Sequence, residues 1–136
     1  MKVVVDTNLF VARKYNKESA SSRILELAKQ NKIQILWTEG IKAEIEQILK
    51  NVKADKLLKN LGQILKERNQ VFPRMKIKEI REDPQDNKFL ECALEGGADL
   101  IVSSDKDILR VGSGFQGIPI FTPKNAVKFL NDKLNN

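Results

Sequence analysis

Short runs of β-branched and aliphatic residues alternate along this chain with longer segments in which apolar residues recur at helical spacing. The runs predict strands at 2–5, 33–37, 100–102 and 118–121. Alternation of this kind favours parallel strands joined by right-handed helical connections. We therefore predict an α/β fold, a three-layer α/β/α sandwich around a central, mostly parallel sheet.

Residues that favour helix caps mark where the helices should begin. In chain order the predicted caps are Ser19 or Ser22, Thr38, Asp55, Asp86 and Thr122. The helix after Asp55 is expected to run to Leu65, and the helix after Asp86 should stop at Gly96 and Gly97. Pro123 should open the last helix, which is expected to end near Leu130.

Two further segments have a less regular pattern. Residues 75–80 alternate apolar and basic side chains, which predicts an edge strand whose lysines discourage stray pairing. A glycine-punctuated loop with Gly112, Gly114 and Gly117 precedes the last strand, and a frayed tail is expected at 135–136. No linker, repeat or low-complexity segment divides the 136 residues, so one domain spanning 1–136 is expected.

Composition excludes several kinds of chemistry. The chain has no histidine and one cysteine, Cys92, which we expect to be a buried apolar residue, as we do Trp37. Serine–histidine and cysteine–histidine catalysis and multi-cysteine zinc sites are therefore excluded. Catalysis, if any, must use carboxylates, hydroxyls, Lys or Arg, or a hard metal ion.

The distribution of apolar and acidic residues also bears on location. No apolar run approaches the roughly 20 residues of a membrane helix. Asp6 follows directly on three valines, where a secretory signal would continue apolar. We expect a cytoplasmic protein without a membrane partner.

The net charge of +6 is concentrated in one stretch. Residues 42–81 hold 11 basic and 5 acidic residues, whereas the rest of the chain is balanced. Such a stretch suits a polyanion-binding flank, and the alternative is a solvated, lysine-rich helical face. Lys42, Lys50 and Lys53 are the residues in it that we expect to bind RNA.

Acidic residues follow the predicted strands. Asp6 ends the first strand, Asp105 follows the third, Asp86 begins the helix before the third, and Glu44 lies two turns into the helix after the second. Ligands of open α/β sheets bind at the carboxyl ends of strands, so these four side chains can share one cleft. Two carboxylates about 5 Å apart repel by roughly 3 kcal/mol at an effective dielectric constant of about 20. Either some hold protons, or a divalent ion is present, and all-oxygen ligands select Mg²⁺ or Mn²⁺.

Each acid also has a simpler interpretation. Asp86 suits a helix cap, Glu44 a solvent-facing residue paired with neighbouring lysines, and Asp105 an Asx-turn. Asp107 suits the cap of a short helix, or a second acid of the site. Asp6 is harder to explain without a site, because a buried acid is costly unless it is bonded or metal-bound.

Four blocks of the sequence resemble a PIN domain in their order and spacing. They are 3–8, 38–44, 83–93 and 98–109. The nearest likeness is to the prokaryotic toxin components of toxin–antitoxin pairs, the VapC-type toxins. The resemblance implies a metal-dependent ribonuclease in which Asp6, Glu44, Asp86 and Asp105 form an acidic quartet, with Asp6 as the central ligand.

The same resemblance implies supporting residues and partners. Asn8 and Ser103 match positions that hold the site by hydrogen bonds, Asp107 matches a second acid common in the family, and Ser104 stands where many relatives have glycine. Family members often form homodimers. The toxins bind a small antitoxin whose C-terminal segment occupies or blocks the acidic cleft.

The sequence thus predicts an Mg²⁺- or Mn²⁺-dependent endoribonuclease that cleaves single-stranded RNA by metal-activated water, as the toxin of a type II pair. The alternative is a catalytically weak PIN-fold module that binds RNA or protein. A phosphotransfer enzyme is disfavoured because position 8 is Asn8 rather than a second aspartate. A DNA 5′-exonuclease is disfavoured by the length of the chain.

Overall fold

A parallel sheet forms the centre of the molecule, in a computed structural model that describes residues 1–80, 83–111 and 115–135. Its four strands are β1 (Lys2–Val5), β2 (Gln34–Ile35), β3 (Leu100–Val102) and β4 (Ile120–Phe121), in the order β2-β1-β3-β4. Val3–Val5 pair with Leu100–Val102, and all six residues are buried. Central parallel strands are covered on both faces, which is why these two strands are uninterrupted apolar runs. All four predicted strands are present, the second and fourth shorter than expected.

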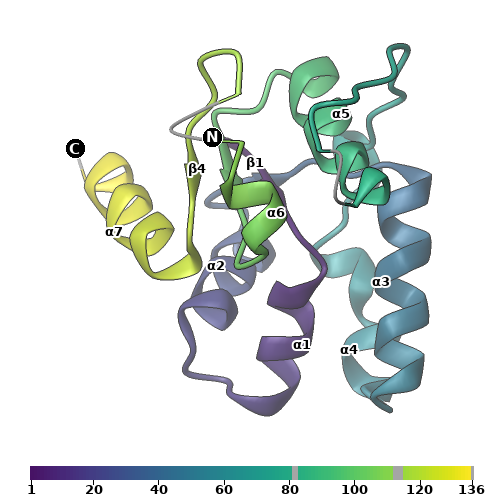
Figure 1. The fold of residues 1–136 in the computed structure, drawn as a ribbon. Helices are drawn as coiled ribbons and strands as arrows, with labels where there is room; N and C mark the ends of the chain where they lie inside the picture. The colour runs from purple at the N-terminus through teal and green to yellow at the C-terminus, as the bar shows by residue number, and fades with distance from the viewer. Residues whose placement is uncertain (81–82, 112–114, 136) are drawn as a thin grey trace.

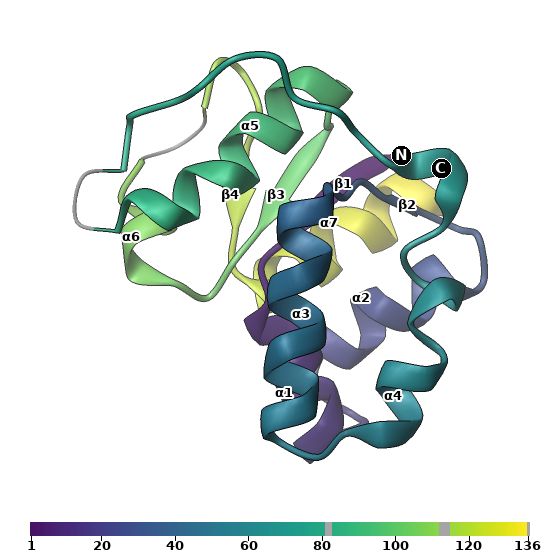
Figure 2. The same ribbon diagram turned by 90° about the vertical axis from the view of Figure 1, so that its right-hand side faces the viewer.

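Helices cover both faces of the sheet. They are α1 (Asn8–Tyr15), α2 (Ala20–Lys29), α3 (Glu39–Asn51), α4 (Asp55–Lys59), α5 (Asn87–Gly96), α6 (Lys106–Leu109) and α7 (Pro123–Leu134). The two views show α3 and α5 on one side of the sheet and α2 and α7 on the other (Figures 1 and 2). The predicted three-layer α/β/α sandwich is confirmed.

Local signals placed several helix ends correctly. Ser19, Thr38 and Thr122 each accept a hydrogen bond from the backbone N–H three residues further on. Helix α5 ends at Gly97, which has the left-handed conformation that favours glycine, with φ of 66°. At Gly96 a Cβ atom would lie 2.7 Å from a methyl of Leu36 and 2.9 Å from one of Val71, so a larger residue would require these side chains to shift.

Four expectations differ from the structure. Helix α1 was not predicted at all, and α7 continues to Leu134 rather than stopping near Leu130. The predicted helix 55–65 is wrong: α4 ends at Lys59, a 3-10 turn follows, and Asp55 lies inside the first turn instead of capping it. The predicted edge strand 75–80 is also wrong, since those residues have no regular secondary structure.

The core contains the two residues expected there. Cys92 is fully buried, and burial raises the pKa of its thiol to about 12. Trp37 is 4% exposed, and its indole N–H donates to the carbonyl of Lys66. Within the described ranges no helix is long and apolar enough to cross a membrane. Expectations that involve Arg81, Gly112, Gly114 and Asn136 lie outside the described residues.

Candidate metal centre

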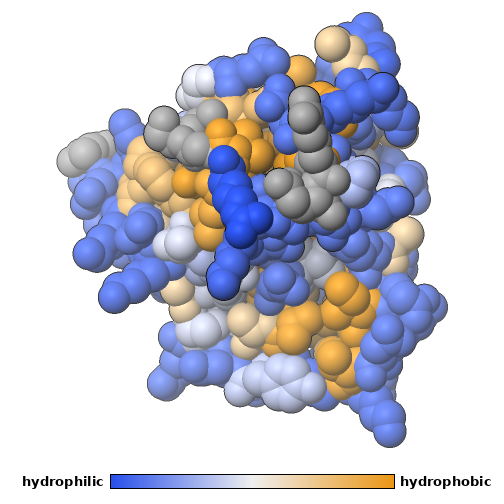
Figure 3. Space-filling model, in the orientation of Figure 1, coloured by the Kyte–Doolittle hydropathy of each residue, from blue (hydrophilic) through white to orange (hydrophobic). Residues whose placement is uncertain are grey.

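The strand order places a crevice at the carboxyl ends of β1 and β3. The chain leaves β1 toward β2 on one side and reaches β3 on the other, so the connections diverge between these two strands. Ligands of doubly wound sheets bind at such a point. Asp6 follows β1, and Ser103, Ser104 and Asp105 follow β3. The face that carries α6 is mainly hydrophilic (Figure 3).

Asp6 fastens the end of β1 to the end of β3. Its Oδ1 accepts the backbone N–H of Asn8 at 2.9 Å, at the start of α1. Its Oδ2 accepts the hydroxyl of Ser103 and the backbone N–H of Ser104, the latter at 3.0 Å. Burial raises the pKa of Asp6, and these hydrogen bonds partly offset the rise. Asn8 thus contacts the site through its backbone, and Ser103 through its side chain.

Asp86, Asp105 and Asp107 form an acidic cluster at the same edge. Each offers one carboxylate oxygen, and these three atoms lie within 4.8 Å of one another. Asp105 caps α6 by accepting the backbone N–H of Asp107 at 2.7 Å. The interpretation of Asp107 as the cap is therefore wrong, and that of an Asx-turn at Asp105 is confirmed. This leaves Asp107 facing the other two acids, with one oxygen 3.3 Å from the guanidinium of Arg110.

Asp86 is the least satisfied acid of the cluster. It is 8% exposed, and its Oδ2 is the single buried side-chain polar atom of the described residues that has no hydrogen-bond partner. Asp86 occupies the N-cap position of α5, as predicted, but its side chain accepts no capping hydrogen bond. Asp83 caps the preceding 3-10 turn, Pro84–Asp86, through the N–H of Gln85. Burial, followed by the charges of Asp105, Asp83 and Glu44, raises the pKa of Asp86 to about 7, although Lys88 opposes the rise.

Glu44 lies beside the cluster but has its own partners. One of its carboxylate oxygens is 2.8 Å from the ammonium of Lys88, and the other accepts the hydroxyl of Thr7. Thr7 is the residue before α1, where its backbone is already helical and its side chain makes no capping hydrogen bond. The partner of Glu44 is thus a lysine from α5, not a neighbour on its own helix.

The donor set fits a hard divalent cation. Three carboxylates converge, and one of them, Asp86, has a buried oxygen without a partner. Its pKa is raised first by burial and then by the neighbouring carboxylates. A divalent ion held by Asp86, Asp105 and Asp107 would supply the missing charge, and carboxylate oxygens are the ligands that Mg²⁺ and Mn²⁺ prefer.

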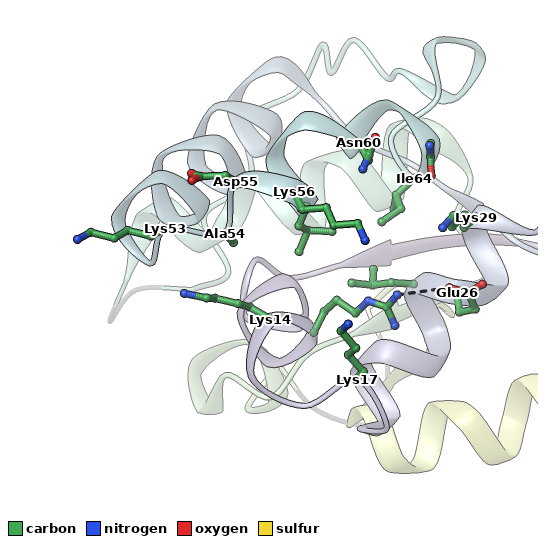
Figure 4. A pocket seen from close by; sticks show the side chains of 14 residues that line it. Lys14, Lys17, Glu26, Lys29, Lys53, Ala54, Asp55, Lys56, Asn60 and Ile64 are labelled. Carbon is green, nitrogen blue, oxygen red and sulfur yellow. Dashed lines mark ion pairs between the residues drawn. The ribbon is translucent and has the colours of Figure 1, made fainter.

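The lysines expected to bind RNA lie in different places along α3 and beyond it. Lys42 has its ammonium 5.4 Å from the centroid of the Trp37 ring, and Lys50 is exposed near the end of α3. Lys53 lines a hollow of about 440 Å³ bordered by α1, α2 and α4 (Figure 4). That hollow has a basic rim and an apolar floor, and none of the five acids described above lines it.

Sequence patterns did not single out Thr7, Asn87 or Lys88. Thr7 and Lys88 meet Glu44 only because α1, α3 and α5 pack together, and the spacing of residues along the chain carries no sign of that meeting. Asn87 is 4% exposed, although a polar residue at the start of a helix is more often an exposed cap than a buried hydrogen-bonding residue.

Comparisons with known proteins agree with this fold. A sequence model of the PIN domain matches residues 2–107. An uncharacterised protein of Methanocaldococcus jannaschii, MJ1680, is 32% identical over 118 residues, which are 82% of this chain and 75% of that protein. The crystal structure of PAE2754 from Pyrobaculum aerophilum superposes with a TM-score of 0.62 at 15% identity, over 97% of this chain and 99% of that one.

The chain belongs to the PIN domain family. PIN domains are generally nucleases, enzymes that hydrolyse phosphodiester bonds of nucleic acids, and the acidic cluster at the crevice suits the divalent ion that such nucleases typically use.

Proposed function

We propose that this protein is an Mg²⁺- or Mn²⁺-dependent endoribonuclease that cleaves single-stranded RNA. The observation that carries the proposal is the buried, unpartnered Oδ2 of Asp86, within 4.8 Å of carboxylate oxygens of Asp105 and Asp107. Asp6, Glu44, Asp86 and Asp105 are the proposed catalytic acids, and Asp107 joins them as a ligand. A bound divalent ion supplies positive charge that lowers the pKa of water and stabilises charge on the reacting phosphate.

The residues of the chain would perform separate tasks. Asp6 accepts N–H groups from both sides of the crevice and so holds the loop that presents Asp105. Asp86 offers its unpartnered Oδ2 and would hold the ion together with Asp105 and Asp107. Ser103 donates to Asp6 and accepts the N–H of Asp105 at 2.9 Å, which keeps these two acids in a fixed relation.

The replacement of Asp86 by asparagine tests the reaction. Asp86→Asn removes a ligand charge but little volume, so Mn²⁺-dependent cleavage of a labelled single-stranded RNA should fall by more than about 100-fold. Asp132→Asn, a surface change on α7, is the matched control and should cleave like the parent. Circular dichroism of both variants should match the parent. Undiminished cleavage by Asp86→Asn would remove this acid from the mechanism.

We further propose that the protein is the toxin of a type II toxin–antitoxin pair, that it forms a homodimer and that it acts in the cytoplasm. The support is the resemblance of its sequence to VapC-type toxins. The hollow of Figure 4 lies away from the acidic cleft and is a second place where an acidic, amphipathic antitoxin segment could bind, since six Lys or Arg side chains line it against two acids, Glu26 and Asp55. Growth arrest on induction in a bacterial host, relieved by Asp86→Asn, would support this role. Normal growth despite active enzyme would contradict it.

A further inference from the structure

A basic groove adjoins the acidic cluster on its α5 side. It has a volume of about 580 Å³ and runs between residues 76–80 and the first turns of α5. Its lining residues are Lys76, Ile77, Lys78, Ile80, Pro84, Gln85, Asn87, Lys88 and Glu91. Pro84, Gln85, Asn87 and Lys88 flank Asp86 in the sequence, so the groove and the acidic cluster share one short stretch of chain.

Side chains of α5 fix the outer wall of this groove. The amide of Asn87 donates to the carbonyl of Ile80 at 3.0 Å and accepts its N–H at 2.9 Å. One turn further along α5, Glu91 accepts the N–H of Ile77 at 2.9 Å. These bonds take the backbone groups that a neighbouring strand would have taken. The wall therefore keeps a fixed position against α5, with Lys76 and Lys78 exposed.

The charge of the groove is positive. Among the described residues that line it, three are lysines and one, Glu91, is acidic, so the lysines outnumber the acid. Lys88 connects the groove to the acids, because it lines the groove and its ammonium is 2.8 Å from a carboxylate oxygen of Glu44. A basic groove next to the acidic cluster attracts a polyanion that the carboxylates alone would repel.

We infer that this groove holds the backbone of single-stranded RNA on one side of the scissile phosphate. Lys76 and Lys78 contact successive backbone phosphates, and Lys88 contacts the phosphate nearest the acids. The inference rests on the proposed ribonuclease function and places the substrate path on the 76–80 segment. The substrate path is thus not on α3, where Lys42 and Lys50 lie.

The salt dependence of RNA binding tests this assignment directly. Each phosphate contact on a single strand contributes about −0.7 to the slope of log K against log salt. Lys76→Gln/Lys78→Gln should therefore make the slope shallower by about 1.4, measured by fluorescence anisotropy of a labelled 12-nucleotide RNA in EDTA, where cleavage is blocked. Lys124→Gln/Lys128→Gln on α7 removes the same charge from exposed positions outside the groove and should leave the slope close to that of the parent.

The outcomes distinguish failure of the groove assignment from failure of the proposed ribonuclease function. If both double variants have the parent's slope while the parent cleaves RNA in Mn²⁺, the groove assignment is overturned and the proposed function stands. If the groove variant alone changes the slope but the parent cleaves nothing, the groove stands and the proposed function fails. If the groove variant loses binding of labelled poly-glutamate and keeps that of RNA, the groove is a protein-binding site and the inference is wrong.

Discussion

Single side chains decide how negative charge is accommodated at the crevice. Asp6 receives hydrogen bonds on both carboxylate oxygens, Glu44 has Lys88 and Thr7, and Asp105 has a backbone N–H. Asp86 alone of these acids keeps a buried oxygen without a partner. The carboxylate best placed to bind a cation is thus the one that has the fewest hydrogen-bond partners in the folded chain.

The raised pKa of Asp86 should make metal binding depend on pH. Below about 7 the carboxyl holds a proton, which the ion must displace, so affinity for Mn²⁺ should increase about tenfold between pH 6 and pH 8. Isothermal titration at several pH values measures this change. Asp86→Asn should bind more weakly and lose most of the pH dependence, whereas Asp132→Asn should retain it. A flat profile in the parent would show that Asp86 releases no proton on binding.

The same pKa sets the sign of a stability effect in the metal-free protein. The folded state holds a proton on Asp86 up to about pH 7, whereas an unfolded chain releases it near the ordinary value of 3.8. Stability from this group is therefore present at low pH and is lost as the pH rises through that window. Asp86→Asn should raise the melting temperature by a few degrees at pH 8, with little gain at pH 4, in thermal unfolding with EDTA.

At the scale of elements, local sequence predicted what depends on local chemistry. These signals involve only residues close together in the chain. They are the valines of β1, the capping hydroxyls of Ser19, Thr38 and Thr122, and the glycines at the end of α5. Helix α1 was missed because only Leu9 and Phe10 are buried in it and Thr7 makes no side-chain cap. The 55–65 prediction joined α4 to a 3-10 turn that begins at Leu61, because the apolar spacing continues across the break.

The segment 75–80 shows why an alternating pattern can mislead. Its backbone hydrogen bonds go to side chains of Asn87 and Glu91 instead of to another strand. The sequence pattern also does not show which of two nearby aspartates makes the capping bond, Asp83 or Asp86 in one turn and Asp105 or Asp107 in the other. In each pair the first aspartate accepts the N–H two residues further on, and the second makes no capping bond of its own.

Removal of the Asn87 amide should loosen this whole element. Asn87→Ala deletes bonds to both backbone groups of Ile80 and to the carbonyl of Pro84, and leaves buried polar groups unpaired. The free energy of unfolding should fall by about 2 to 4 kcal/mol, measured in urea, and RNA cleavage should fall with it because Asp86 precedes this residue. Asn125→Ala, exposed on α7, should change stability by less than about 0.5 kcal/mol. Equal stability of the two variants would contradict the role of Asn87.

At the scale of the whole molecule, the acids stand at one edge of a core that does not depend on them. The central strands β1 and β3 are apolar and buried, as are the inward faces of α3, α5 and α7. Alternation of strands and helices predicted a parallel sheet, but it did not predict the strand order β2-β1-β3-β4 that makes the crevice. The contact of α3 with α5, which brings Lys88 to Glu44, required the folded chain.

Metal removal should therefore destabilise the protein without unfolding it. At pH 8 and a Mn²⁺ concentration of 100 times the dissociation constant, binding should add about 2.7 kcal/mol and raise the melting temperature by several degrees. EDTA should reverse that rise and leave the circular dichroism spectrum at 25 °C unchanged. The response should be nearly absent in Asp86→Asn and intact in Asp132→Asn. A loss of secondary structure in EDTA would mean that the fold itself depends on the ion.

The complete burial of Cys92 makes the molecule convenient for spectroscopy. Its thiol stays protonated at neutral pH and is closed to reagents in solution, so alkylating probes and oxidants should pass it by. A cysteine introduced at an exposed position of α7, such as Asp132, would then be the one thiol that takes a fluorophore or spin label. Labelled RNA bound to such a protein would report the direction in which the strand crosses the molecule, by energy transfer from its two ends.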